Sequence, residues 1–328
     1  GDTADTNESV TTSSITVQGL ATLEDGTHIF FKIRDGRTTF FDYLYQESDG
    51  TSDVEIFYLT NITAQADIFS GDADANTVYA YAGNDTVYGQ GGNDIVYGNN
   101  GNDLVHGGIG NDSLYGERDV DILYGNDGAD RLEGGLGADS LYGGIGNDTI
   151  YSDDGADIID GGADIDLLLF TGGTNRVVVN LSTSAITYDT TNQLAANSVL
   201  DVVGYTDTVV NLSIENVTGG TGADTFMGST GDNTLNGADG NDYFYSSIGA
   251  DSIIGGNGTD TLDFTNLTTT AGVNVTLNTF LSFSGITQKV TTMENFTGSS
   301  QNDTITGDGV ANVLNGGAGA DTLKGMAG

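Results

Sequence analysis

The sequence predicts an all-β fold, a parallel β-roll or β-solenoid with further β-rich segments as a cap and as spacers. Three observations predict it. A nine-residue unit, GGxGxDxUx with U a large apolar residue, recurs along the chain. Ten such units follow one another without insertion, and every U position among them is aliphatic. Glycine occurs 51 times and proline is absent, so glycine is expected to make the sharp turns between short strands.

The first element, residues 1–61, differs from the rest of the chain and is expected to form an amino-terminal β cap. Its segments ITVQGLATL and THIFFKIRDGRTTFFDYLYQ alternate polar and apolar residues. The second segment does so around Asp35-Gly36, a dipeptide that is common in tight hairpin turns. The pattern therefore favours a hairpin in the cap.

The first repeat array is expected over residues 62–169. Each of its ten regular units has an aspartate at the sixth position and Val, Leu or Ile at the eighth. Two weaker units precede them, with Asp67 and Asn76 at the sixth position. A second array over residues 219–263 and a third over residues 298–328 repeat the pattern with gaps.

Two spacers, residues 170–218 and 264–297, separate the three arrays. They contain RVVVNLSTSAITY and GVNVTLNTFLSFSG, whose alternation and β-branched content are typical of strands. Each spacer ends in a Glu-Asn pair nine residues before the next sixth-position aspartate, at Glu215 and at Glu294. We therefore expect both spacers to be β-rich.

The nine-residue period predicts how the units stack. The three residues after each aspartate form a short strand, and the U residue at its centre faces one side. Two units wound into one 18-residue coil give two parallel sheets whose U side chains face each other. Aspartates 18 residues apart then lie above one another at one edge, with Asp85, Asp103 and Asp121 in one row and Asp94 and Asp112 in the other.

The charge balance restricts the partners. Forty-seven acidic residues face eight basic ones, a formal net charge of −39. Such a chain is not expected to bind nucleic acid or an anionic membrane surface, and it has no apolar run long enough for membrane insertion. Cysteine is absent and there are two histidines, so a thiolate or multi-histidine metal site is not expected. A solvated acidic surface of the halophilic kind remains open, whereas the regular apolar positions disfavour disorder.

Divalent cations are a third explanation of the acidity. Carboxylates stacked about 5 Å apart repel by roughly 1–3 kcal/mol per pair. Calcium takes six to eight oxygen ligands in flexible geometry, and two aspartates from adjacent coils with turn carbonyls supply such a shell. Magnesium demands tighter octahedral geometry, and zinc prefers nitrogen or sulfur. We therefore predict several Ca²⁺ ions, with folding coupled to their binding.

The repeats resemble those of the repeats-in-toxin (RTX) family of hemolysin-type calcium-binding β-rolls. Residues 80–169 match throughout, for example GGIGNDTIY at 143–151, and residues 219–263 and 298–324 match with gaps. The resemblance implies extracellular calcium, export of the unfolded chain by type I secretion, and folding outside the cell. It assigns metal ligation to sixteen sixth-position aspartates: Asp85, Asp94, Asp103, Asp112, Asp121, Asp130, Asp139, Asp148, Asp157, Asp166, Asp224, Asp242, Asp251, Asp260, Asp303 and Asp321.

Several units depart from the family pattern. Asparagine replaces the sixth-position aspartate at Asn76, Asn233 and Asn312. In the turn before Asp121, Asp119 replaces a glycine and Arg118 adds a positive charge, which puts a calcium site there in doubt. Asp164 likewise replaces a glycine in the last unit of the first array, as an end cap would.

Tyrosine is frequent at the ninth position, where alternation places it on the outer face of each sheet. These tyrosines are either a surface for a glycan or another subunit, or stacked neighbours that only stabilise the coils. His106 falls in the same row and is expected to fill it like a tyrosine. The sequence has no HExxH or GxSxG motif, and no enzymatic activity is expected.

Together these features predict an extracellular calcium-binding structural protein, a bacterial surface-layer (S-layer), matrix or adhesin subunit that assembles into sheets or filaments. A glycan or another cell-surface molecule is a further candidate partner. The alternative is a calcium-folding and type I secretion module of a larger RTX enzyme or toxin. The sequence lacks an initiator Met and ends within a repeat, so a mature or cut part of a longer protein is expected.

Overall fold

The structure, a computed structural model of the chain, describes residues 66, 68–170, 176–182, 184, 186–187, 193–200, 206–209, 213–267, 271–283 and 286–326, and the strand backbones at 17–22, 28–33, 44–46 and 55–58. All regular elements in these residues are strands, and none of the described segments forms a helix that could span a membrane. The chain divides into two compact units, Gly1–Asp148 and Thr149–Gly328. This division falls inside the first predicted array, and the predicted segment boundaries stay predictions.

The first unit begins with an antiparallel meander. Its strands are β1 (Val17–Thr22), β2 (His28–Ile33), β3 (Leu44–Gln46) and β4 (Glu55–Tyr58). Consecutive strands pair antiparallel, and β4 pairs parallel with the first strand of one repeat sheet. Strands β2 and β3 pair antiparallel, and the Asp35-Gly36 turn lies outside the described residues.

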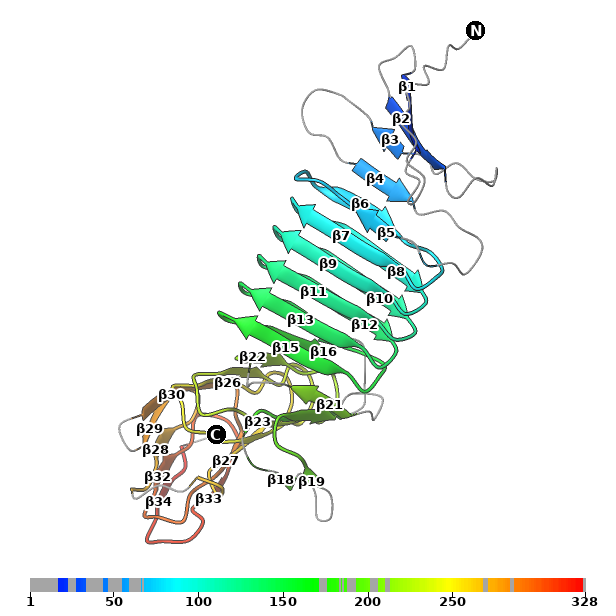
Figure 1. Cartoon of the computed structure of the whole chain (residues 1–328). Helices are drawn as coiled ribbons and strands as arrows, with labels where there is room; N and C mark the ends of the chain where they lie inside the picture. Colours follow the sequence, from blue (N-terminus) through cyan, green and yellow to red (C-terminus); the bar gives the residue numbers. More distant parts are fainter. Residues whose placement is uncertain are drawn as a thin grey trace. The chain divides into compact units, whose positions relative to one another are not determined.

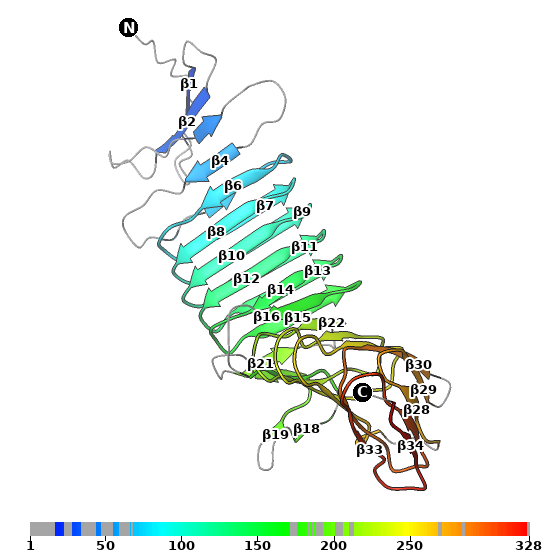
Figure 2. The ribbon, with the colours of Figure 1, turned by 180° about the vertical axis from the view of Figure 1, so that it is seen from behind.

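The rest of the first unit consists of two parallel sheets (Figures 1 and 2). One contains β6 (Asn76–Tyr79), β8 (Ile95–Asn100), β10 (Ser113–Arg118) and β12 (Arg131–Leu136). The other contains β5 (Ile68–Ser70), β7 (Thr86–Gly91), β9 (Leu104–Ile109), β11 (Ile122–Asp127) and β13 (Ser140–Ile145). Register partners are 18 residues apart, as for Leu114 and Leu132. The predicted parallel solenoid is therefore confirmed.

The U residues form the core between the two sheets. Their side chains are fully buried in the first unit at Val87, Val96, Val105, Leu114, Leu123, Leu132 and Leu141. Residues on either side of each U point outward because side chains alternate along a strand. A coil buries few side chains, so the glycine-rich edges must also be held together.

The second unit continues the pattern with two larger sheets. One contains β14 (Thr149–Ser152), β16 (Leu167–Phe170), β22 (Asn216–Thr218), β24 (Thr234–Asn236), β26 (Ser252–Ile254), β30 (Ile286–Thr291), β29 (Phe280–Phe283), β28 (Asn274–Thr276), β32 (Thr304–Thr306) and β34 (Thr322–Lys324). The other contains β15 (Ile158–Ala163), β21 (Thr206–Val209), β20 (Ser198–Leu200), β17 (Val178–Asn180), β23 (Thr225–Met227), β25 (Tyr243–Tyr245), β27 (Thr261–Asp263), β31 (Asn295–Thr297) and β33 (Val313–Asn315). A hairpin of β18 (Ile186–Thr187) and β19 (Gln193–Leu194) lies apart from both (Figure 1).

Each spacer folds as an antiparallel three-stranded meander inserted into one sheet. In the first, β17, β20 and β21 lie between β15 and β23, while in the other sheet β16 pairs directly with β22. In the second, β28, β29 and β30 lie between β26 and β32, while β27 pairs directly with β31. The two meanders thus enter opposite sheets, and the repeat register resumes on both faces after each one.

Candidate metal centre

The sixth-position aspartates lie at the sheet edges, directly before each strand. Fifteen of the sixteen are buried, with at most 2% of the side chain exposed, and Asp321 in the last described coil is partly exposed. Buried carboxylates need partners, because an isolated buried charge is strongly unfavourable. The partners of each carboxylate therefore show what these positions can bind.

In most of these carboxylates one oxygen accepts a backbone N–H from the strand before it in the sheet. The Oδ1 atom of Asp112 accepts the backbone N–H of Asp94 at 2.7 Å, and Oδ1 of Asp121 accepts that of Asp103 at 2.7 Å. The same bond links the following coils, for example from Asp130 to Asp148 at 2.8 Å. These bonds form a continuous ladder and fix the orientation of the carboxylates, because a charged acceptor strengthens each bond.

The second oxygen has no hydrogen-bond donor in a group of these aspartates. Among the described residues, the Oδ2 atoms of Asp94, Asp103, Asp112, Asp121, Asp130, Asp242 and Asp260 are buried without a partner. Buried polar atoms of this kind are uncommon. Their recurrence at the same position of the repeat fits a row of cation-binding oxygens.

These oxygens face a gap that exists because the first position of the unit is glycine. A methyl group placed on Gly89 would lie 2.3 Å from Oδ2 of Asp94 and 2.4 Å from the carbonyl oxygen of Gly107 in the next coil. A methyl on Gly125 would likewise lie 2.4 Å from Oδ2 of Asp130. Carboxylate and carbonyl oxygens from two coils therefore converge where a Cβ would otherwise stand.

The turns hold these carbonyls through left-handed backbone at the second and fourth positions. Gly110 and Gly128 at the fourth position have φ of 137° and 151°. At the second position, Gln90 and Asn99 adopt φ of 82° and 73°, although a non-glycine residue there costs roughly 1 kcal/mol. The expectation that glycine makes these turns thus holds at the fourth position in most units, but at the second position only in some, such as those with Gly108, Gly135 and Gly144.

The doubtful turn before Asp121 keeps the repeat backbone. Glu117 and Asp119 adopt φ of 79° and 74°, so the chain follows the same path without glycine. A methyl placed on Gly137 would lie 1.7 Å from the carbonyl oxygen of Asp119. In a regular turn, a methyl placed on Gly128 would lie 1.8 Å from the carbonyl oxygen of Gly110. The altered residues therefore leave the carbonyl arrangement intact.

Burial raises the pKa of the carboxyls in the ladder. The pKa of Asp103 rises to about 7 and that of Asp121 to about 8, first because of burial and then because of neighbouring carboxylates. The pKa of Asp242 in the second unit rises to about 7 for the same reasons. Without a cation, the charged form of these groups is therefore disfavoured near neutral pH, and a bound cation would restore it.

Three predicted ligands differ from the others. Oδ2 of Asp224 accepts the N–H of Gly220 at 3.0 Å, and that of Asp303 accepts the N–H of Ser299 at 2.7 Å. Oδ2 of Asp251 accepts the Ser247 hydroxyl and the amide of Gln288. Hydrogen bonds within the protein already satisfy these carboxylates, so they need a cation less than those with a bare Oδ2.

The oxygen donors fit calcium. In the described residues no three His, Asp or Glu side chains gather in one place, so a cation would combine at most two such groups with main-chain carbonyls. Such a mixed oxygen shell, with room for water, is typical of calcium and poor for zinc.

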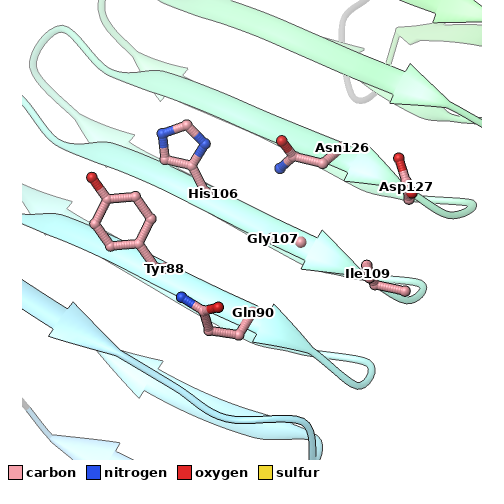
Figure 3. Close-up of a pocket in the computed structure, with 8 residues that line it drawn as sticks. Tyr88, Gln90, His106, Gly107, Ile109, Asn126 and Asp127 are labelled. Atoms are coloured by element: carbon pink, nitrogen blue, oxygen red, sulfur yellow. The ribbon is translucent and has the colours of Figure 1, made fainter.

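The outer faces carry the predicted aromatic rows. The rings of Tyr79, Tyr97 and Tyr115 stack with centroids 4.8 and 4.9 Å apart. On the other face His106 stacks on Tyr88 at 5.1 Å, and Figure 3 shows both rings above the same sheet. A shallow groove of about 320 Å³ lies beside them, lined also by Gln90, Ile109, Asn126 and Asp127. The predicted stacking is thus present, with His106 as a ring in the row, and a surface for a glycan or another subunit stays a prediction.

The coiled parallel sheets and the rows of edge aspartates define a calcium-binding β-roll of nonapeptide repeats. The chain belongs to the RTX family: the model of the RTX calcium-binding nonapeptide repeat matches residues 63–96, 97–132, 133–168, 218–253, 245–265 and 297–328, more than half of the chain. No curated protein sequence matches it. The repeats of this family bind calcium, which agrees with the donors described above.

The sequence-based assignment missed three acids in the spacers. Asp207 is fully buried, and its Oδ1 accepts the N–H of Asp157 at 3.1 Å. Glu215 accepts the N–H of Asp166, and Glu294 that of Asp260. The Glu-Asn pairs, in phase with the next array, were the only signal for the two glutamates, and nothing marked Asp207.

Proposed function

We propose that this chain is an extracellular structural protein whose repeats fold on binding Ca²⁺, and that it serves as a subunit of a bacterial surface layer, matrix or adhesin. The observation that carries the calcium-dependent part is the row of buried carboxylate oxygens without a donor, each facing a carbonyl of the next coil. Calcium would supply the positive charge that these oxygens lack. The aromatic rows on both faces stiffen the coils and suit a load-bearing role.

Different residues of the repeat have different roles in the proposed calcium binding. Oδ1 of each aspartate orients the carboxylate by accepting an N–H from the coil before it. Glycine at the first position leaves space for the oxygens to converge, and left-handed residues at the second and fourth positions direct the carbonyls. In this proposal the acids of the repeats are used for folding, and no catalytic role is assigned to them.

Circular dichroism with and without calcium tests the folding part. We expect chelation to reduce the β signal strongly and to lower the melting temperature of the protein that stays folded, and millimolar calcium to restore both, because the buried carboxylates repel one another without the ion. Magnesium at the same concentration is the control and should restore much less. A melting curve that is the same in chelator and in calcium would contradict the proposal.

Negative-stain electron microscopy tests the surface-layer part. A structural subunit should form sheets or filaments when calcium is added to the purified chain. A secretion and folding module of a larger RTX enzyme or toxin should remain monomeric, and its complete reading frame should encode a catalytic domain. Calcium-dependent assembly thus separates the two functions.

A further inference from the structure

The two spacers carry glutamates at the place where a repeat would carry its aspartate. Glu294 directly precedes β31, and Asp260 directly precedes β27, the parallel neighbour of β31. The register partners Thr261 and Asn295 are 34 residues apart instead of 18, yet the backbone N–H of Asn295 donates to the carbonyl of Asp260 at 2.8 Å. The same bond links Ser113 to Asp94 in the repeats, also at 2.8 Å.

The oxygens around Asp260 match those of a repeat site one by one. Oε2 of Glu294 accepts the N–H of Asp260 at 2.8 Å, as Oδ1 of Asp112 accepts that of Asp94 at 2.7 Å. A methyl on Gly255 would lie 2.4 Å from Oδ2 of Asp260 and 2.1 Å from the carbonyl oxygen of Thr292. Thr292 thus takes the place that Gly107 has in the repeat.

A second observation points to an ion. Asp260 is fully buried, and its Oδ2 atom has no hydrogen-bond partner. That atom faces the gap at Gly255, where the Thr292 carbonyl also points. A well-packed spacer without a ligand would have supplied a donor here, as Gln288 does for Asp251.

The difference in side-chain length compensates for a shorter turn. In the repeat, four residues lie between Gly107, which supplies the carbonyl, and Asp112, whereas one lies between Thr292 and Glu294. The extra methylene of glutamate allows its carboxylate to reach the N–H of Asp260 although the turn has lost three residues.

The first spacer repeats the glutamate hydrogen bond and the facing carbonyl of this arrangement. Oε2 of Glu215 accepts the N–H of Asp166 at 2.9 Å, and a methyl on Gly161 would lie 2.2 Å from the carbonyl oxygen of Ser213. The hydroxyls of Ser213 and Thr292 each accept the N–H of a facing turn glycine, at 2.8 and 2.7 Å. Both spacers therefore close with the same sequence, Ser or Thr, a buried apolar residue, Glu and Asn.

We propose that Glu294 with Asp260, and Glu215 with Asp166, form two calcium sites of a non-repeat type, in which a spacer glutamate and the carbonyl two residues before it replace the ligands of the next coil. This inference rests on the proposed calcium binding of the repeats. It also explains two departures from the pattern: one coil after each glutamate stands an asparagine, Asn233 or Asn312, so the next coil adds no carboxylate beside that glutamate.

Calcium stoichiometry of the full chain tests the proposal. Glu294→Gln keeps an oxygen that can accept the N–H of Asp260 and removes only the charge. After equilibrium dialysis, atomic emission should show one calcium ion fewer per chain than in the unchanged protein, and two fewer when Glu215→Gln is added. Glu133→Gln, at a half-exposed position paired with Arg131, is the matched control and should lose none. An unchanged stoichiometry in Glu294→Gln would overturn the proposal.

A second measurement does not depend on the variant folding. Crystals of the unchanged chain grown with terbium should show an anomalous peak between Gly255, Asp260 and Glu294. Peaks at the repeat aspartates without one here would refute the spacer sites and leave the repeat sites standing. A chain that binds no calcium or terbium at all would instead refute the proposed function itself.

Discussion

Replacing Asp103 by Asn is expected to have opposite effects with and without calcium. Asp103 is buried, its Oδ1 accepts the N–H of Asp85 at 2.8 Å, and its Oδ2 has no partner. Asparagine keeps the acceptor and nearly the same shape, so the ladder bond can persist. The substitution therefore removes mainly the negative charge, and with it the ability to hold a cation against the carbonyl of Gly116.

The magnitude follows from ligand linkage. An ion present at 100 times its dissociation constant stabilises the folded state by about 2.7 kcal/mol per site. Losing one site at that concentration lowers the melting temperature of a unit of this size by about 5–11 °C, at about 2–4 °C per kcal/mol. In chelator at pH 8 the sign reverses, because the pKa of Asp103 is about 7 and its buried charge destabilises the metal-free fold.

Thermal unfolding in calcium and in chelator, both at pH 8, measures the two effects. The control is Asp119→Asn in the turn, where an exposed Oδ2 accepts the N–H of Gly101 at 3.0 Å. This control should change the melting temperature little in either buffer. If Asp103→Asn lowered the melting temperature equally in both buffers, the carboxylate would be a hydrogen-bond acceptor only, and the reasoning would fail.

Three further predictions concern the gap, the carboxyls and the aromatic rows. Gly107→Ala should weaken calcium binding measured by titration calorimetry, since the alanine methyl would lie 2.2 Å from Oδ2 of Asp112. The control is Gly309→Ala, whose methyl would meet no atom within 4 Å and should leave calcium binding unchanged. The buried carboxyls bind protons more tightly in the folded chain than in the unfolded chain, as the pKa of about 8 for Asp121 shows. Their protonation therefore stabilises the metal-free fold fully below about pH 4, and this stabilisation is lost as the pH rises through 6–8. Circular dichroism in chelator should show more β structure at pH 4 than at pH 8, and a flat pH profile would contradict this prediction. Tyr97→Ala removes two ring stacks and should lower the free energy of unfolding by about 1–3 kcal/mol. The number of bound calcium ions should stay the same, and a loss of ions would contradict the separate roles of the aromatic rows and the aspartate sites.

The periodic features of this fold could be predicted from the sequence because they follow from the count of residues per coil. Once two nine-residue units make one coil, the register of Leu114 with Leu132 is fixed, and so is the row of aspartates. The outward stacking of Tyr97 on Tyr115 follows from the same count and from alternation along a strand. Each of these features follows from residue numbers alone, without any interatomic distance.

The hydrogen-bond partners of each carboxylate could not be predicted in this way. Asp242 and Asp251 have the same position in the repeat, yet Oδ2 of Asp251 accepts donors from Ser247 and Gln288 while that of Asp242 has none. Gln288 lies on β30 in the second spacer, 37 residues further along the chain. Its role depends on how the spacer is wound, which no local pattern encodes.

The position of the oxygens, rather than the spacing of residues, defines a site in this protein. A repeat reaches the required arrangement with four residues between the carbonyl and the short side chain of Asp112, and a spacer reaches it with one residue between the carbonyl and the longer side chain of Glu294. Selection that preserves the arrangement can therefore exchange turn length for side-chain length. A search for GGxGxDxUx detects only one of these two solutions. Candidate ligands in interrupted arrays are better found by asking which side-chain oxygen accepts the N–H of the last repeat aspartate before the interruption.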